Sequence, residues 1–329
     1  MFKNFFRLVD FEDSYDRHDL PHETMVRFNF NNLSNFPDAN IVIDGSVNGF
    51  LFLRDINYKH ETLFVCNPIT REFFELPRPD GVVRYPMVVT HGFGVTQKTG
   101  EYKIVRILHQ RELNPINGHC IRVPFSQCQV YTLGKTGEWR TICGPGPGFA
   151  YDSRLIGVFV RGNIHWLIQD LEGFELISCF DLENEVFQPF PPPFPGKRIL
   201  GSLGVLRDCL ALCDNTSHTD IDIWVMKQYG VEKSWVKEIV IKKMPELVGP
   251  SFQIVHALKI FEDAWGLPFK AFSFSTKCPK RASYSIVKIK VAEEVDVDQP
   301  RGPNSIEAIH HVPSFLSLRR FVTENVSTY

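Results

Sequence analysis

The chain has 329 residues, of which 43% are hydrophobic, with 36 lysines and arginines against 38 aspartates and glutamates. This composition is typical of a globular protein and excludes a disordered or fibrous chain. The formal net charge of −2 disfavours a general role in binding nucleic acid or an anionic membrane. No apolar stretch is long enough to span a bilayer, and charges interrupt the N-terminal segment too early for a signal peptide. We therefore expect an intracellular protein, in the cytoplasm or the nucleus, without nucleic-acid or membrane partners.

The frequent phenylalanines, prolines and glycines, numbering 28, 22 and 22, and the short apolar segments between turn residues predict an all-β fold. Along the chain, residues 5–43 contain three short strand-like runs that form an incomplete first unit. Four complete units follow, each with two hairpins. The first hairpins contain residues 47–53, 100–107, 161–168 and 207–213, and the second hairpins are residues 63–77, 129–142, 177–191 and 222–241. Residues 252–290 predict another degenerate unit, and residues 306–318 a final strand.

A large aromatic residue follows the turn of each second hairpin. These residues are Phe74, Trp139, Phe187 and Trp235, at intervals of 65, 48 and 48 residues. Four strands in about 48 residues are the unit of a propeller blade, and one such sheet cannot bury both of its faces alone. The aromatics are therefore expected to fill the gaps between adjacent blades.

We predict a β-propeller of about six four-stranded blades, with five or seven also compatible with the pattern. A single domain would cover residues 1–320, with a degenerate first blade. A strand within residues 306–318 would close the ring and remove its exposed edges. Residues 321–329 are interpreted as a polar C-terminal tail.

Cysteine and histidine positions do not predict a metal site. Five cysteines lie in apolar strand-like runs, so the eight are interpreted as reduced thiols, mostly in the core. They are Cys66, Cys120, Cys128, Cys143, Cys179, Cys209, Cys213 and Cys278. Cys209 and Cys213 would lie about 13 Å apart on one strand, too far to share a zinc ion. His165 alternates with apolar residues and is interpreted as a core histidine.

The sequence also contains no complete motif for nucleotide binding or for a hydrolase nucleophile. The run Gly92-Phe93-Gly94 continues to Gln97 and breaks the dinucleotide fingerprint, and Gly201 to Gly204 has the wrong spacing for a nucleophile elbow. The run PFPPPFP, residues 189–195, is interpreted as a stiff connection between blades rather than a polyproline ligand. We expect no cofactor and no enzymatic activity.

Eight segments, in their order and spacing, resemble the F-box associated domain of plant kelch-type F-box proteins. They begin with SVNGFLFL and CNPITREFFELP, continue through HGFGVTQKTGEYKIVRI, CQVYTLGKTGEWRTI, GVFVRGNIHWLI and ISCFDLENEVFQPFPPP, and end with LGVLRDCLALC and DIWVMKQYGVEKSWVKE. IEAIHHVPSFLSL also resembles the end of that family. The similarity covers about residues 10–320. The F-box proteins that the chain resembles include the group that acts in immune-receptor turnover and the pollen S-locus group.

The resemblance implies that the chain recognises a target protein for ubiquitination and ubiquitin-dependent degradation by an SCF-type cullin E3 ligase. In that family an N-terminal F-box docks on a Skp-type adaptor. Here strand-like residues begin at FFRLVDF, and no amphipathic three-helix segment precedes them, so we expect this chain to lack the F-box. This departure has three interpretations: the sequence is truncated, the chain is a decoy that binds targets without causing their degradation, or another subunit recruits it to the ligase.

Target-binding residues are expected in the connections between strands, because the residues on blade faces are fixed by packing. We select the segments 78–88, 109–126, 144–153, 214–220 and 262–268. Their candidate residues are Arg84, Tyr85, Arg111, His119, Arg122, His218 and Trp265.

The alternative is a propeller enzyme, such as a glycosidase or a galactose-oxidase-like metal enzyme. Such enzymes gather polar residues at the same strand position around the central channel. The corresponding positions in this chain are assigned to Phe50, Tyr102, Ile164 and Cys209, an apolar set. This assignment favours a binding protein over an enzyme.

Overall fold

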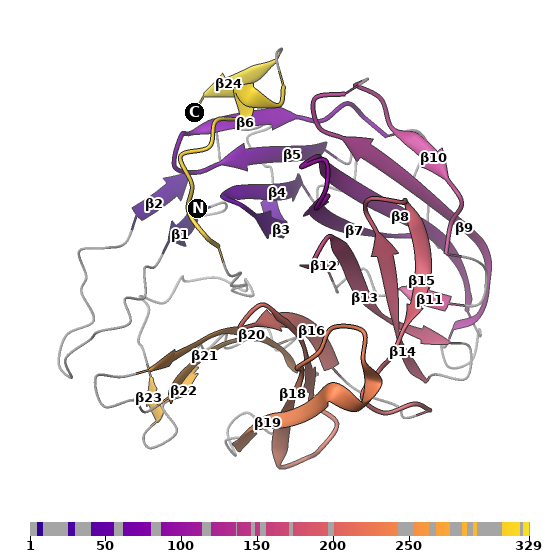
Figure 1. The fold of residues 1–329 in the computed structure, drawn as a ribbon, viewed down its shortest axis with the longest axis vertical. Helices are drawn as coiled ribbons and strands as arrows, with labels where there is room; N and C mark the ends of the chain where they lie inside the picture. The colour runs from indigo at the N-terminus through magenta and orange to yellow at the C-terminus, as the bar shows by residue number, and fades with distance from the viewer. Residues whose placement is uncertain are drawn as a thin grey trace.

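The computed structural model has an all-β fold (Figure 1). The structure describes residues 5–8, 26–29, 41–55, 62–79, 87–113, 120–135, 137–145, 149–151, 156–170, 174–196, 201–242, 253–262, 268–276, 285–287, 292–294, 311–322 and 325–328. Within these ranges the strands form six antiparallel sheets, and the helices are two short 3-10 turns, η2 (Glu232–Ser234) and η4 (Leu318–Arg320). None of the helices in these ranges is long and apolar enough to cross a membrane.

The six sheets follow one another along the chain. Sheet 1 pairs β1 (Phe5–Leu8) with β2 (Val26–Asn29). Sheet 2 contains β3 (Ile41–Val47), β4 (Phe50–Asp55), β5 (Thr62–Asn67), β6 (Glu72–Glu75) and β24 (Val326–Thr328). Sheet 3 contains β7 (Met87–Val95), β8 (Tyr102–Leu113), β9 (Cys120–Thr132) and β10 (Arg140–Ile142).

The next three sheets repeat this plan. Sheet 4 contains β11 (Phe149–Tyr151), β12 (Val158–Val160), β13 (Asn163–Asp170), β14 (Glu175–Asp181) and β15 (Val186–Phe190). Sheet 5 contains β16 (Gly201–Leu206), β17 (Cys209–Asp214), β18 (Asp220–Met226) and β19 (Trp235–Lys242). Sheet 6 contains β20 (Gln253–Glu262), β21 (Pro268–Thr276), β22 (Ser285–Val287) and β23 (Ala292–Glu294). The predicted all-β fold of about six units is confirmed, and three of the six sheets have four strands.

The sheets are arranged in chain order around an arc, as Figure 1 shows. The first strands of sheets 2, 3, 5 and 6 and strand β12 of sheet 4 contact one another in sequence, from β3 to β7, from β7 to β12, from β12 to β16 and from β16 to β20. These strands are therefore the innermost ones, as in a propeller. In sheet 4, β12 pairs with the start of β13, and the preceding short strand β11 pairs with its end. Apolar clusters fill the spaces between sheets 2 and 3, between sheets 3 and 4, and between sheets 4 and 5.

Tight turns set the pairing of the inner two strands in three sheets. The turns are Asn48-Gly49, Arg161-Gly162 and Arg207-Asp208, and both residues of each have a positive φ, between 49° and 87°. Such a pair is the type I′ turn, whose twist matches that of the strands on either side. Gly49 has a second reason to be glycine, because a Cβ there would lie 2.3 Å from the Cβ of Ser314.

The four repeated aromatics lie between adjacent sheets. Phe74 belongs to the cluster between sheets 2 and 3, where its ring stacks 6.5 Å from that of Tyr131, and Trp139 packs against the same cluster. Phe187 packs against the cluster between sheets 3 and 4. Trp235 is buried in the cluster between sheets 4 and 5.

The C-terminal strap, residues 311–322, differs from the strand that we expected within residues 306–318. Its residues 311–317 form no strand, and residues 306–310 lie outside the described part of the chain. The strap crosses sheet 2, where Asn67 Nδ2 donates to the carbonyl oxygens of Ser314 and Leu316, both at 2.8 Å. The strand that completes sheet 2 is β24, paired with β6, so residues 321–329 are more than a polar tail.

Three other expectations differ from the structure in detail. The segment Ile41–Val47 belongs to sheet 2 rather than to the first unit. Residues 109–113 and 120–126 extend β8 and β9 as a long hairpin instead of forming an insertion loop, because their ladder continues through two register shifts to the pair Leu113 and Cys120. The described cysteines are free thiols: Cys66, Cys128, Cys179 and Cys213 are buried, Cys209 is half-buried, and Cys143 is exposed.

Candidate functional site

The connections between strands divide over two rims of the ring, because neighbouring antiparallel strands run in opposite directions. The first-to-second and third-to-fourth connections of each sheet leave from one rim, which we call the turn rim. The second-to-third connections, and those from one sheet to the next, leave from the opposite rim, which we call the loop rim. Turns of neighbouring sheets touch on the turn rim, for example where Lys98 N donates to Glu183 Oε2 at 3.1 Å.

Four of the five segments selected from the sequence, 78–88, 109–126, 144–153 and 214–220, leave from the loop rim, whereas segment 262–268 joins the first two strands of sheet 6 and has its residues 263–267 outside the described part of the chain. Arg111 lies in β8 and Arg122 in β9, so the long hairpin brings them onto neighbouring strands. His218 is exposed in the connection between β17 and β18. Arg84, Tyr85, His119 and Trp265 lie outside the described residues.

The connection that carries His218 is ordered by its own side chains. Asp214 Oδ1 accepts from the backbone N–H of Thr216 at 2.9 Å, and Ser217 Oγ accepts from that of Thr219 at 3.2 Å. Such side-chain turns shape a loop without help from secondary structure. The loop therefore presents an exposed imidazole on a defined backbone.

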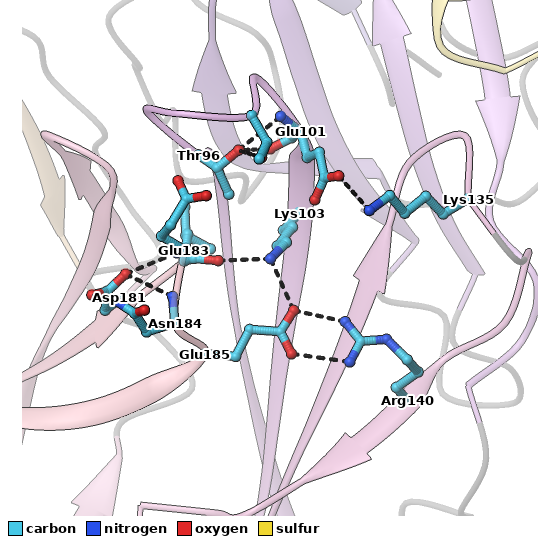
Figure 2. Close-up of polar contacts among 11 residues, drawn as sticks. Thr96, Glu101, Lys103, Lys135, Arg140, Asp181, Glu183, Asn184 and Glu185 are labelled. Atoms are coloured by element: carbon cyan, nitrogen blue, oxygen red, sulfur yellow. Dashed lines mark hydrogen bonds and ion pairs between the residues drawn. The ribbon is translucent and has the colours of Figure 1, made fainter.

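The turn rim contains a polar network between sheets 3 and 4 (Figure 2). Lys103 Nζ, whose side chain is only 6% exposed, donates to the carbonyl of Leu182 at 2.7 Å and lies 2.9 Å from Glu185 Oε1. Arg140 binds the same carboxylate with both terminal nitrogens, at 3.0 and 2.6 Å. Burial alone would raise the pKa of Glu185, but the hydrogen bonds from Arg140 and Lys103 outweigh it and hold that pKa below its usual value.

The adjoining turn is equally well paired. Asp181 Oδ1 accepts from the backbone N–H groups of Glu183 and Asn184 at 2.8 and 3.1 Å, and its Oδ2 accepts from Asn184 Nδ2 at 2.7 Å. Burial would raise the pKa of Asp181, yet these bonds lower it overall. These carboxylates are held as anions by fixed donors, so the network joins two sheets rather than offering a general base.

A second polar contact crosses from sheet 4 to sheet 5. His165 is fully buried, with Nδ1 3.2 Å from the carbonyl oxygen of Val158 and Nε2 2.9 Å from the hydroxyl of Tyr229. A carbonyl only accepts, so Nδ1 carries the proton and Nε2 accepts from the Tyr229 hydroxyl. Burial lowers the pKa of His165 to about 4, so this histidine is neutral at pH 7. The interpretation of His165 as a core histidine agrees with this geometry.

The innermost strands are more polar than the sequence assignment implied. Phe50, Tyr102, Ile164 and Cys209 begin or adjoin the starts of β4, β8, β13 and β17, which are second strands, so they do not mark the central channel. On the true inner strands, His91 Nδ1 of β7 lies 3.5 Å from Asp44 Oδ2 of β3.

This inner pair is itself enclosed. Asp44 occupies a β-bulge between Ile43 and Gly45, and Arg54 Nε donates to Asp44 Oδ2 at 2.5 Å. Both Asp44 and His91 are buried. Throughout the described ranges, no group of three or more His, Cys, Asp or Glu residues is arranged to hold a metal ion.

Sequence reasoning did not select three residues that meet at the seam between sheets 4 and 5. Arg161 lies in the β12–β13 turn, and Lys227 and Tyr229 lie in the β18–β19 turn. All three line one shallow recess on the turn rim. The turn signals around them are visible in the sequence, but their contact is not, because more than 60 residues separate the two turns.

Comparison with known proteins identifies a family for nearly the whole chain. The family model described as "F-box associated beta propeller domain" matches residues 6–318. The Arabidopsis thaliana "F-box protein At3g07870" is 32% identical over 231 residues, covering 65% of this chain and 54% of the relative. "F-box protein CPR1" from the same plant is 30% identical over 220 residues, covering 60% and 52%. The chain thus spans about half the length of the curated relatives that it matches.

Among solved structures, the SapL1 lectin in complex with alpha methyl fucoside is similar with a TM-score of 0.40 and 12% identity. The match covers 73% of this chain and 76% of the lectin. At this level of similarity the lectin says nothing about what this chain binds.

Proposed function

The chain belongs to the F-box associated beta propeller family, and from this premise we propose that it recognises target proteins for an SCF-type cullin E3 ubiquitin ligase. The observation that carries the proposal is the family match over residues 6–318, together with relatives that are named F-box proteins. The partners in this proposal are a target protein, a Skp-type adaptor and a cullin.

A binding role rather than a catalytic one is part of the proposal. The described carboxylates at the seam between sheets 3 and 4 are paired with lysine, arginine or backbone donors. His165 is neutral and buried. These groups hold the sheets together, and a rigid scaffold of this kind positions the connections on its rims for recognition.

Co-precipitation from plant extract tests the ligase role. The chain would be compared with the same chain carrying a plant F-box at its N-terminus, and both precipitates would be probed for the Skp-type adaptor and the cullin. We expect the fused chain to recover both, together with a shared set of target proteins that the unfused chain also recovers.

Two outcomes separate the parts of the proposal. Recovery of adaptor and cullin by the unfused chain would mean that the propeller itself contacts them. Failure of both chains to enrich any common protein over an unrelated propeller of similar charge would contradict the target-recognition role. A control with Glu101→Gln, a rim change away from the candidate segments, should leave the captured set unchanged.

A further inference from the structure

We propose that the recess between sheets 4 and 5 on the turn rim binds an acidic side chain of a target protein. This inference rests on the proposed function and names the chemistry of the partner. The recess is lined by Arg161, Asp208, Cys209, Leu210, Met226, Lys227 and Tyr229. No segment selected from the sequence includes it, and four of the five selected segments lie on the opposite rim.

The recess has a fixed aromatic wall. The hydroxyl of Tyr229 is held 2.9 Å from His165 Nε2, and its ring lies 5.1 Å from that of Phe190. The guanidinium carbon of Arg161 lies 6.0 Å from the centre of the Tyr229 ring. Because the ring is already positioned from two sides, a ligand would not have to order it on binding.

The backbone positions Arg161, the cationic residue at the edge of the recess. Arg161 occupies a type I′ turn with φ +50°, and its carbonyl accepts from Asn163 Nδ2 at 3.0 Å. The neighbouring Gly162 packs against the β7–β8 turn, where a Cβ would meet the side chain of Gln97 at 2.9 Å. The turn is therefore held between two sheets, and the exposed Arg161 side chain projects from a fixed point.

The charges around the recess favour an anionic ligand. Lys227 and Arg207 both pair with Glu238. Arg161 contacts Tyr229 but has no carboxylate partner among the described residues, although Asp208 also lines the recess. These five groups, three cationic and two anionic, sum to one positive charge. A carboxylate from a partner would supply the planar acceptor that a guanidinium binds best.

Size argues against a small-molecule ligand. The recess is a small hollow, whereas drug-sized ligands need pockets of roughly 300–1,000 Å³. Leu210 and Met226 are buried in its lining and Arg161 is exposed at its edge, so a partner's Asp or Glu would contact Arg161 at the edge while an adjacent apolar residue covers the hollow.

Subtractive peptide selection on the full chain tests this inference. A phage library of random 12-residue peptides would be selected for binding to the chain and depleted on the Arg161→Glu variant. We expect the retained peptides to share an Asp or Glu beside an apolar residue. Replacing that acid by Asn or Gln should weaken binding at least tenfold, and so should Arg161→Gln or Lys227→Gln in the protein.

The matched control is Arg71→Gln. Arg71 is also an exposed arginine with positive φ in a turn of the same rim, but it lies in sheet 2. This variant should bind the peptides like the original chain. Loss of binding in the Arg71 variant, enrichment of peptides without a shared acid, or no enrichment at all would overturn the inference.

The two proposals fail in different ways. If the target proteins from plant extract bind the original chain and the Arg161→Gln variant equally, target recognition stands and the recess is not its site. If the peptides bind as expected while the F-box fusion recovers no adaptor, the recess stands and the ligase role falls. Thermal unfolding of Arg161→Gln and Lys227→Gln, two exposed positions, checks that the variants are folded.

Discussion

The indole Nε1 of Trp139 donates a 2.7 Å hydrogen bond to the carbonyl oxygen of Pro77, which lies just after β6 of the preceding sheet. Trp235 makes the corresponding bond to Pro191 at 3.0 Å, two sheets further along the ring. The repeated aromatic therefore does more than fill space, because it ties each of these sheets to the end of the one before it. The side chain of Phe187 has no N–H group and contributes packing alone.

The bond from Trp139 predicts a stability loss in Trp139→Phe. The change keeps most of the apolar contact but leaves the Pro77 carbonyl without its donor, so we expect a loss of about 1–3 kcal/mol in the free energy of unfolding. Urea unfolding followed by fluorescence or circular dichroism measures it. Trp224→Phe is the matched control, since Trp224 Nε1 has no hydrogen-bond partner among the described residues. Equal losses in the two variants would contradict the role of the bond.

Removing the negative charge of Glu185 should lower the free energy of unfolding more than removing that of a surface acid. Glu185→Gln removes the charge that faces Lys103 and Arg140, and Lys103 is almost fully buried. We expect a loss of about 1–3 kcal/mol, because a buried cation would lose its anionic partner. Glu101→Gln, whose partner Lys135 is mostly exposed, should cost less than about 1 kcal/mol.

The pKa of Glu185 also sets the direction of a pH effect. Its folded pKa lies below its unfolded value, so its stabilising contribution is present above about pH 4.3 and is lost as the pH falls through the folded pKa. The stability difference between the original chain and Glu185→Gln should therefore shrink on acidification below pH 4.3. A difference that grows at low pH would contradict this assignment.

Local sequence patterns predicted the strands and turns of the sheets. They did not predict the contacts between sheets. The turn residues Asn48-Gly49 and the aromatics Trp139 and Trp235 have strong local signals, and the structure places them as turns and as packing between sheets. The strand β24 was missed because three residues carry too little alternation to be separated from a tail. The meeting of Arg161 with Tyr229 depends on how two sheets stack, which no local pattern encodes.

The C-terminal strap predicts a contrast between two of its own residues. Leu318 is fully buried in the cluster between sheets 2 and 3, and its N–H donates to Glu72 Oε2 at 2.8 Å. Phe315, three residues earlier, is 89% exposed. Leu318→Ala should cost about 2–5 kcal/mol through lost burial and the cavity left behind, and Phe315→Ala less than about 0.5 kcal/mol.

The same experiment tests whether the strap is part of the fold. Chemical unfolding of both variants would be compared with that of the original chain. Similar, small losses would mean that the strap does not contribute to the stability of the ring.

The buried histidine at the seam between sheets 4 and 5 predicts a pH dependence of stability. The pKa of His165 is lowered to about 4 in the folded chain, against about 6.5 when unfolded, so the unfolded chain binds more protons between these values. Stability should therefore fall by up to roughly 3 kcal/mol from this group as the pH drops from 6.5 to 4. In His165→Phe the slope of unfolding free energy against pH should be shallower in that window, because the substituted position takes up no proton on unfolding. Unfolding midpoints at pH 4.5, 5.5, 6.5 and 7.5 measure the two slopes, and identical slopes would mean that His165 can take up a proton without leaving its hydrogen bonds to Val158 and Tyr229.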